Sequence, residues 1–167
     1  MLHKLPNLFK LTLTLLIGGL LFTACDDDSS GPINKLNVSE TIQAEDNLSS
    51  ANTLLSDYDL ADTLAQDRPF TVFVPTDAAI EKEDLDGLTE EEIKAILKYH
   101  IVPENLTFEE LKEVETLETL QGASLQFSTE DDTVIVNDGQ AMITEPGLDA
   151  SNGTVFKVDT VLTAGEE

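Results

Sequence analysis

Tyr99 and His100 are the neighbouring side chains best suited to chemistry in this sequence, and they lie in the segment LKYHIVP at 97–103. A phenol beside an imidazole can transfer protons in general acid–base catalysis, or donate and accept hydrogen bonds in recognition. The other histidine, His3, lies close to the N-terminus. Because His100 has neither a cysteine nor a second histidine near it in the sequence, a zinc site of the usual composition is excluded.

Other catalytic patterns are missing from the sequence. It contains no Gly-x-Ser-x-Gly nucleophile elbow, no phosphate-binding loop and no dinucleotide-binding fingerprint. Among its 33 acidic residues some carboxylates must lie close together by chance, which leaves an enzyme acting on glycans through surface carboxylates as an alternative. The sequence favours a protein without catalytic activity and without a cofactor.

Two acidic turns offer oxygen ligands that could suit calcium. They are the segments EDD at 130–132 and NDG at 137–139, which flank a predicted strand at 133–136. Their spacing differs from that of the helix-loop-helix calcium loop, so we interpret both as solvated turns and predict no metal site. The NDG segment is in addition a strong hairpin signal.

The elements that position Tyr99 and His100 are marked by capping signals. Thr89 followed by Glu92 forms a capping box, which predicts the start of a helix that Pro103 ends. His100 lies on the apolar face of this helix, which predicts a buried, hydrogen-bonded imidazole. Tyr99 is turned roughly 100° away on a regular helix, and we expect it to be partly exposed.

The remaining pattern places helices mainly before strands. Helical spacing occurs from residue 39 and again from 48 to 58, and a second capping box at 107–110 predicts a short helix to about residue 114. The apolar run at 70–74 predicts a strand buried on both faces, and period-two patterns after residue 116 predict further strands. We interpret 145–153 as a loop and 154–162 as the last strand. This order favours an α+β fold.

Three segments together resemble the conserved boxes of the fasciclin domain family. They are PFTVFVPTDAAI at 69–80, LKYHIVP at 97–103 and NGTVFKVDTVL at 152–162, which resemble the first conserved box, the Tyr-His box and the second conserved box. The resemblance covers about residues 34–163. It implies a fasciclin-like fold, in which N-terminal helices pack against a β-sandwich or wedge of mostly C-terminal strands.

The resemblance also implies roles for particular residues. The Tyr-His dipeptide of this family is linked to adhesion, so Tyr99 and His100 form the candidate interaction box. The other two boxes are expected to contribute structural residues, namely Phe70, Val72, Val74, Pro75, Thr76, Asp77, Asn152, Gly153, Val155, Val158 and Val161. We expect Thr76 to cap the following helix and the 152–153 turn to adopt positive φ. Phe156 stands where the family commonly has histidine, which argues against polar chemistry shared between the boxes.

The N-terminus is similar to a bacterial lipoprotein signal peptide. Lys4 and Lys10 precede an apolar run at 11–24, which is too short to span a bilayer comfortably and is followed by Cys25. Phe22 stands where leucine is more usual, and an ordinary secretory peptide with an incidental cysteine is the alternative. As the lone cysteine, Cys25 cannot form an internal disulfide, and its position predicts lipid attachment.

The chain therefore divides into a lipoprotein signal peptide at 1–24, an acidic flexible tether at 25–35, a fasciclin-like domain at 36–163 and a C-terminal tail at 164–167. We expect an exported, membrane-anchored lipoprotein, at the outer membrane or cell surface in preference to the inner membrane. Acidic residues directly after the cysteine resemble a surface-export signal in some bacterial groups and an inner-membrane retention signal in others.

The charge restricts the partners. Removal of Lys4 and Lys10 with the signal peptide leaves seven basic residues against 33 acidic ones, a net charge of −26. Such a chain is a poor partner for nucleic acid and for anionic membrane surfaces, so we expect membrane contact only through the lipid anchor. We expect an adhesion or interaction module whose partner is an envelope or extracellular-matrix protein or a polysaccharide. The alternatives are an enzyme or accessory factor acting on glycans, and an acidic scaffold with no specific ligand.

Overall fold

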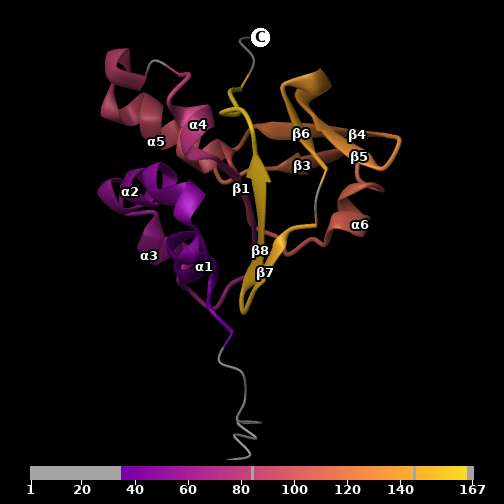
Figure 1. The fold of residues 1–167 in the computed structure, drawn as a ribbon, viewed down its shortest axis with the longest axis horizontal. Helices are drawn as coiled ribbons and strands as arrows, with labels where there is room; N and C mark the ends of the chain where they lie inside the picture. Colours follow the sequence, from indigo (N-terminus) through magenta and orange to yellow (C-terminus); the bar gives the residue numbers. More distant parts are fainter. Residues whose placement is uncertain (1–34, 84, 145, 165–167) are drawn as a thin grey trace, which may run out of the picture. The chain divides into compact units, whose positions relative to one another are not determined.

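The computed structural model describes residues 35–83, 85–144 and 146–164 (Figure 1). The predicted signal peptide, Cys25 and the tether up to residue 34 lie outside these ranges, as does the predicted tail beyond residue 164. Within the described ranges, no helix has both the length and the apolar character needed to cross a membrane.

The helices come mainly before the strands, as the sequence predicts. The helices are α1 (Val38–Ala44), α2 (Ser49–Asp57), α3 (Ala61–Leu64), α4 (Asp77–Ile80), α5 (Glu90–Tyr99) and α6 (Phe108–Leu111), with 3-10 turns η1 (Asp46–Leu48), η2 (Leu85–Gly87) and η3 (Asn137–Gly139). The strands are β1 (Phe70–Pro75), β2 (Ile101–Val102), β3 (Thr116–Glu118), β4 (Ser124–Glu130), β5 (Thr133–Val136), β6 (Ala141–Ile143), β7 (Leu148–Ala150) and β8 (Gly153–Val158).

The strands form two four-stranded sheets, in the orders β2-β1-β8-β7 and β3-β4-β5-β6. Strands β1 and β8 run parallel, with Phe70 opposite Gly153 at one end and Pro75 opposite Val158 at the other. The remaining pairs are antiparallel. The first and last strands of the domain are therefore neighbours, and together they form the middle of the first sheet.

Side chains of β1 and β8 point alternately into two hydrophobic cores. Val72, Val74 and Val155 belong to the core that contains α1, α2 and α3, which we call the helix-side core. Phe73 and Phe156 belong to the core beneath β3–β6, which we call the sheet-side core. In Figure 1 the three helices lie on one side of β1 and β8, and the second sheet lies on the other. The apolar run at 70–74 is thus buried on both faces, which confirms that prediction.

Aromatic contacts occupy the middle of the sheet-side core. The ring centroid of Phe73 lies 5.6 Å from that of Phe127 and 5.8 Å from that of Phe156. Such offset ring pairs stabilise a core beyond the area they bury. Phe156 is fully buried in this cluster and is part of the apolar core.

Capping boxes start three of the helices. The boxes at Thr89 and Thr107 form as the sequence predicts, with Glu92 and Glu110 as their partners three residues later. Each glutamate carboxylate accepts a hydrogen bond from the backbone N–H of its capping threonine and another from the threonine hydroxyl. These bonds, the backbone one first, lower the pKa of both glutamates. A third box, formed by Asn37 and Glu40, starts α1 before the predicted residue 39.

The predicted cap at Thr76 is wrong in its chemistry. Thr76 has the backbone conformation of a cap, but its side chain makes no capping hydrogen bond. The neighbouring Asp77 instead accepts hydrogen bonds from the Ser50 backbone N–H and the Ser49 hydroxyl, both at 2.8 Å. The Ser50 bond is the main cause of the lowered pKa of Asp77. Asp77 therefore satisfies the N-terminus of α2, a helix that lacks a cap of its own.

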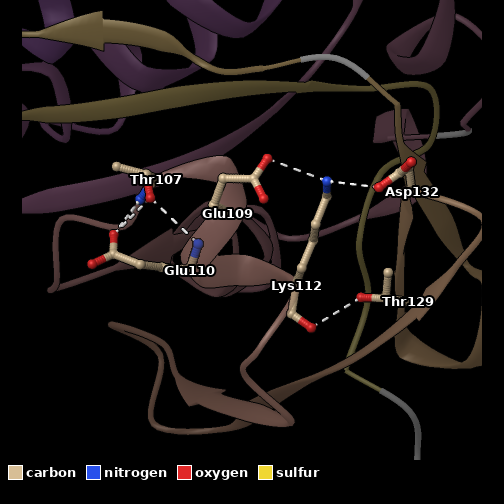
Figure 2. A network of polar contacts seen from close by, with 6 residues as sticks. All are labelled: Thr107, Glu109, Glu110, Lys112, Thr129 and Asp132. Carbon is tan, nitrogen blue, oxygen red and sulfur yellow. Dashed lines mark hydrogen bonds and ion pairs between the residues drawn. The ribbon is translucent and has the colours of Figure 1, made fainter.

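Lys112 connects helix α6 to the β4–β5 hairpin (Figure 2). Its ammonium group lies 3.2 Å from Glu109 and 3.1 Å from Asp132, and the Thr129 hydroxyl donates to its carbonyl. Both carboxylates raise the pKa of Lys112, with the hydrogen bond to Asp132 as the main cause. One carboxylate of the predicted EDD turn is thus part of an ion-pair network. Helix α6 ends at Leu111, three residues before the predicted end.

Three strand boundaries differ from the prediction. Residues 148–150, predicted as loop, form β7 and pair with β8 in a hairpin. Residues 101–102, predicted to continue the helix to Pro103, form β2 and pair with β1. Strand β8 ends at Val158 and not at residue 162. β2 exists because it pairs with β1, and β7 exists because it pairs with β8. β8 ends where its pairing with β1 ends.

The prediction of positive φ at the 152–153 turn is also wrong, because neither residue adopts it. Gly153 is required for a different reason: a Cβ at this position would lie 2.0 Å from the Phe70 carbonyl oxygen of the adjacent strand. Asn152 accepts from the Val38 backbone N–H (2.8 Å) and donates to the carbonyls of Leu64 (2.8 Å) and Gln66 (2.6 Å). This dipeptide therefore joins α1, α3 and the two central strands.

Candidate functional site at the Tyr-His box

His100 is the C-cap residue of α5 and is buried. Its Nε2 accepts a hydrogen bond from the Leu162 backbone N–H (2.9 Å), so the proton must be on Nδ1, which donates to the Ile96 carbonyl (2.7 Å). Burial lowers the pKa of His100 to about 4, from an ordinary value of 6.5. The imidazole is therefore neutral at neutral pH, and both ring nitrogens are bonded inside the fold.

Tyr99 is also buried, with 3% of its surface exposed, so the expectation of partial exposure is wrong. Its ring packs in the sheet-side core, because the second sheet covers the side of α5 that helical periodicity alone leaves open. The phenol donates to the Ser124 carbonyl (3.2 Å) and accepts from Asn137 Nδ2 (3.0 Å). Both members of the box thus have structural partners.

A groove of about 590 Å³ opens beside Tyr99. Its walls come from the end of α5, the start of β4, the η3 turn and the chain after β8, and they consist of Tyr99, Ala123, Ser124, Gln126, Asn137, Asp138, Gln140, Thr163 and Ala164. Ligand pockets typically occupy about 300–1,000 Å³, so this volume suits a small ligand or part of a polymer. We call it the Tyr99 groove.

A hydrogen-bonded network fixes one part of the groove wall. Asn137 accepts from the Gln126 backbone N–H (3.0 Å) and donates to the Tyr99 hydroxyl and to the Gln140 side chain (both 3.0 Å). The Gln140 amide in turn bonds to the Thr163 hydroxyl at 2.7 Å. Because each member holds the next, these side chains form a preorganised surface.

The η3 turn holds its side chains in an unusual backbone conformation. Asn137, Asp138 and Gly139 all have positive φ, of 49°, 54° and 100°. Asn, Asp and Gly are the residues that adopt this region at least cost, which explains the NDG sequence. The turn closes the β5–β6 hairpin, as the sequence predicts, and it places Asp138 in the wall of the groove.

Three further side chains of the groove keep their hydrogen-bonding capacity. Ser124, Gln126 and Asp138 are exposed, and among the described residues their side chains have no hydrogen-bond partner. They supply a hydroxyl, an amide and a carboxylate. A ligand in the groove could bond to all three without breaking the network of Asn137.

The described lining of the groove offers hydrogen-bonding groups but no acid–base pair. Of its lining residues only Asp138 and Tyr99 are ionisable, and Tyr99 is already bonded on both sides. A general acid–base mechanism needs a second group with a matched pKa. In the described part of the chain, no three His, Cys, Asp or Glu side chains come together as metal ligands.

Tyr99 lines the groove, whereas the predicted structural residues of the other two boxes are not among its lining residues. Phe70, Val72, Val74, Pro75, Val155, Val158 and Val161 are buried. Sequence reasoning did not identify Ser124, Gln126, Gln140 or Thr163 as site residues, and it took the 137–139 segment as a turn. No local motif joins these residues, because they come from separate segments of the chain that only the fold brings together.

The fold and these boxes agree with the comparisons with known proteins. The fasciclin domain model matches residues 46–164, and the chain belongs to the fasciclin domain family. The solved structure of a domain pair from the insect cell adhesion molecule fasciclin I is similar with a TM-score of 0.67 and 20% identity, over 77% of this chain and 51% of that one.

Relatives in other organisms have different lengths. The chain is 30% identical to human periostin over 130 residues, which cover 75% of this chain and 15% of periostin. It is 27% identical to an uncharacterized protein of Synechocystis over 77% of this chain and 98% of that protein. The chain thus matches only a small part of periostin but nearly all of the Synechocystis protein.

Proposed function

We propose that this protein is a lipid-anchored adhesion or protein-interaction module of the cell envelope, without catalytic activity. The observation that carries the proposal is the Tyr99 groove, whose lining offers hydrogen-bonding groups but no paired acid and base. His100, the side chain best suited to catalysis, is buried, neutral and bonded on both nitrogens. A family that includes a cell adhesion molecule supports the same function.

The partner we propose is a protein or polysaccharide of the envelope or extracellular matrix. The net charge of −24 for the whole chain argues against nucleic acid and against direct contact with anionic lipid. A lipid on Cys25 would attach the protein to the membrane. The acidic segment at 25–35 would act as a flexible linker that lets the domain contact partners at a distance from the membrane. We propose the outer membrane or the cell surface as its place.

The anchor is tested by membrane fractionation of the Cys25→Ala variant in the source organism, with Ser29→Ala in the same segment as the matched control. The cysteine variant should leave the membrane fraction because it lacks the lipid attachment point, whereas the control should stay. If Cys25→Ala remained in the membrane fraction after a high-salt wash, the anchor would not be a lipid on this residue.

The interaction is tested by capture of envelope and matrix fractions on purified residues 26–167, at low and at high salt. Saturable binding that survives high salt would support a specific module, because nonspecific attraction of cations to an acidic protein is screened. Absence of saturable binding would favour an acidic scaffold. Turnover of glycoside substrates at any pH between about 4 and 8, the range in which carboxylate pairs usually work, would contradict the noncatalytic proposal.

A further inference from the structure

The lining of the Tyr99 groove differs from the rest of the protein in its charge. Of the nine described residues that line it, Asp138 is the only one of the charged residue types Asp, Glu, Lys and Arg. Among the described residues no lysine or arginine lines the groove, so none of them can neutralise an anionic polysaccharide or a phosphate. With a single carboxylate in the part of its lining that the structure describes, it is also not a strong attractor of basic segments.

The groove also lacks the anchors of a protein interface. Protein-binding hot spots are usually formed by exposed aromatic, arginine or large aliphatic side chains that enter a pocket on the partner. Here the apolar contributions are Ala123 and Ala164, and the ring of Tyr99 is buried. The chemistry that remains is hydrogen bonding to a polar, uncharged ligand.

The open side chains match the hydroxyl groups of a sugar. The Asp138 carboxylate can accept from two neighbouring hydroxyls, while the Gln126 amide can both donate and accept. The Ser124 hydroxyl adds one more donor and acceptor. Because Asn137 and Gln140 are already held by the network around Tyr99, little conformational entropy is lost there when a ligand binds.

We propose that the Tyr99 groove binds a neutral, hydroxyl-rich glycan, with Asp138 and Gln126 as its specificity-determining residues. This inference rests on the proposed interaction function and names the chemical class of the partner. Without an exposed aromatic ring to stack on, a short oligosaccharide binds weakly, and a polymer gains affinity by presenting many copies of the same unit. Binding is insensitive to salt, because it does not depend on paired charges.

The first test is an NMR titration of ¹⁵N-labelled residues 25–167 carrying Cys25→Ser. The probes are short uncharged oligosaccharides of glucose, mannose and galactose, with heparin and polygalacturonate fragments as charged comparisons. At least one uncharged sugar should shift the amides of Gln126 and residues 137–140, equally at low and high salt. Shifts caused only by the charged fragments, or by no sugar at all, would overturn the proposal.

The second test compares two aspartates that both have positive φ. Asp138→Asn removes the carboxylate but keeps a residue that tolerates positive φ, so the fold should persist. The matched control is Asp131→Asn, at φ 45° in the other hairpin turn and not in the groove lining. Loss of a hydrogen bond to a charged group should weaken sugar binding about tenfold or more in Asp138→Asn and leave the control unchanged. Equal affinities would overturn the role of Asp138.

The experiments distinguish failure of the glycan proposal from failure of the proposed interaction function. If the parent captures an envelope protein through residues of this groove and no uncharged glycan binds, the glycan proposal is wrong while the interaction function stands. If neither sugars nor any envelope fraction bind saturably, both are wrong. Binding of a neutral polymer that Asp138→Asn and Gln126→Ala both weaken would support the proposal.

Discussion

Asn152 and Asn137 make similar connections in two regions of the molecule, but to different kinds of partner. Asn152 bonds to three main-chain groups, on Val38, Leu64 and Gln66, and thereby holds two helices against the central strands. Asn137 bonds to one main-chain group and two side chains, which themselves line the Tyr99 groove. Both are half-buried in turns next to a strand. The first fixes the backbone, and the second fixes a surface.

From this comparison we expect the contacts around Asn152 to tolerate less change than the side chains around Asn137. Main-chain groups at helix ends are present in every sequence and must be satisfied, so a residue that satisfies them is architectural. Side-chain partners can change without loss of the fold. We therefore expect mutations around Asn152 to affect the free energy of unfolding, and mutations around Asn137 to affect binding.

The largest effect is expected at Gly153, beside Asn152. Gly153→Ala places a Cβ 2.0 Å from a backbone atom of β1, so the central strands must separate. We expect a loss of about 3 kcal/mol or more in the free energy of unfolding, measured by urea denaturation. Gly87→Ala is the matched control, because no atom lies within 4 Å of its added Cβ. Equal stability of the two variants would refute the close-approach argument.

The two asparagines can be compared directly. Asn152→Ala leaves three main-chain groups without their partner, and we expect it to cost about 3 kcal/mol. Asn137→Gly can keep the positive φ, and the former partners of Asn137 then face water in the groove. We therefore expect a smaller loss, about 1–2 kcal/mol in the free energy of unfolding. Denaturant unfolding of both variants gives the difference. A larger loss in Asn137→Gly would reverse the assignment of the two regions.

His100 bonds the end of α5 to the chain after β8, and its contribution should depend on pH. Its pKa is lowered in the folded state, so the unfolded chain binds the extra proton first as the pH falls. The stability that neutral His100 supplies is complete above pH 6.5 and is lost as the pH falls to about 4. The size of this loss is about 3 kcal/mol by linkage.

The matching variant is His100→Ala, which should cost about 1–3 kcal/mol at neutral pH through its lost hydrogen bonds and packing. Its unfolding free energy should also vary less between pH 6.5 and 4 than that of the parent, because the proton uptake is gone. An unchanged melting temperature together with lost adhesion would instead assign His100 to binding.

The smallest effect is expected at Tyr99. Tyr99→Phe keeps the buried ring but removes a donor to Ser124 and an acceptor for Asn137, which should cost about 1 kcal/mol. Tyr58→Phe, a half-buried tyrosine of the helix-side core, serves as the control. If Tyr99→Phe bound the partner as the parent does, the hydroxyl would not be needed to position Asn137 in the groove.

Local signals in the sequence predicted much of the fold and little of the site. The capping boxes at Thr89 and Thr107, the buried strand at 70–74 and the 137–139 hairpin are confirmed, because each depends on residues close together in the chain. Strand β7 was missed because it exists only through pairing with β8. The groove was missed for the same reason, since its wall combines residues from 99 to 164.

The sequence by itself determined the α+β class, the family and the starts of α5 and α6, because periodicity, caps and box motifs act over a few residues. Only the tertiary structure decided that Tyr99 is buried, that Asp77 caps a distant helix and that Gly153 is needed for close strand approach. Those outcomes depend on which helices and strands pack against one another in the fold. Parallel pairing of the first and last strands sets that arrangement, and it brings together residues more than eighty positions apart in the chain.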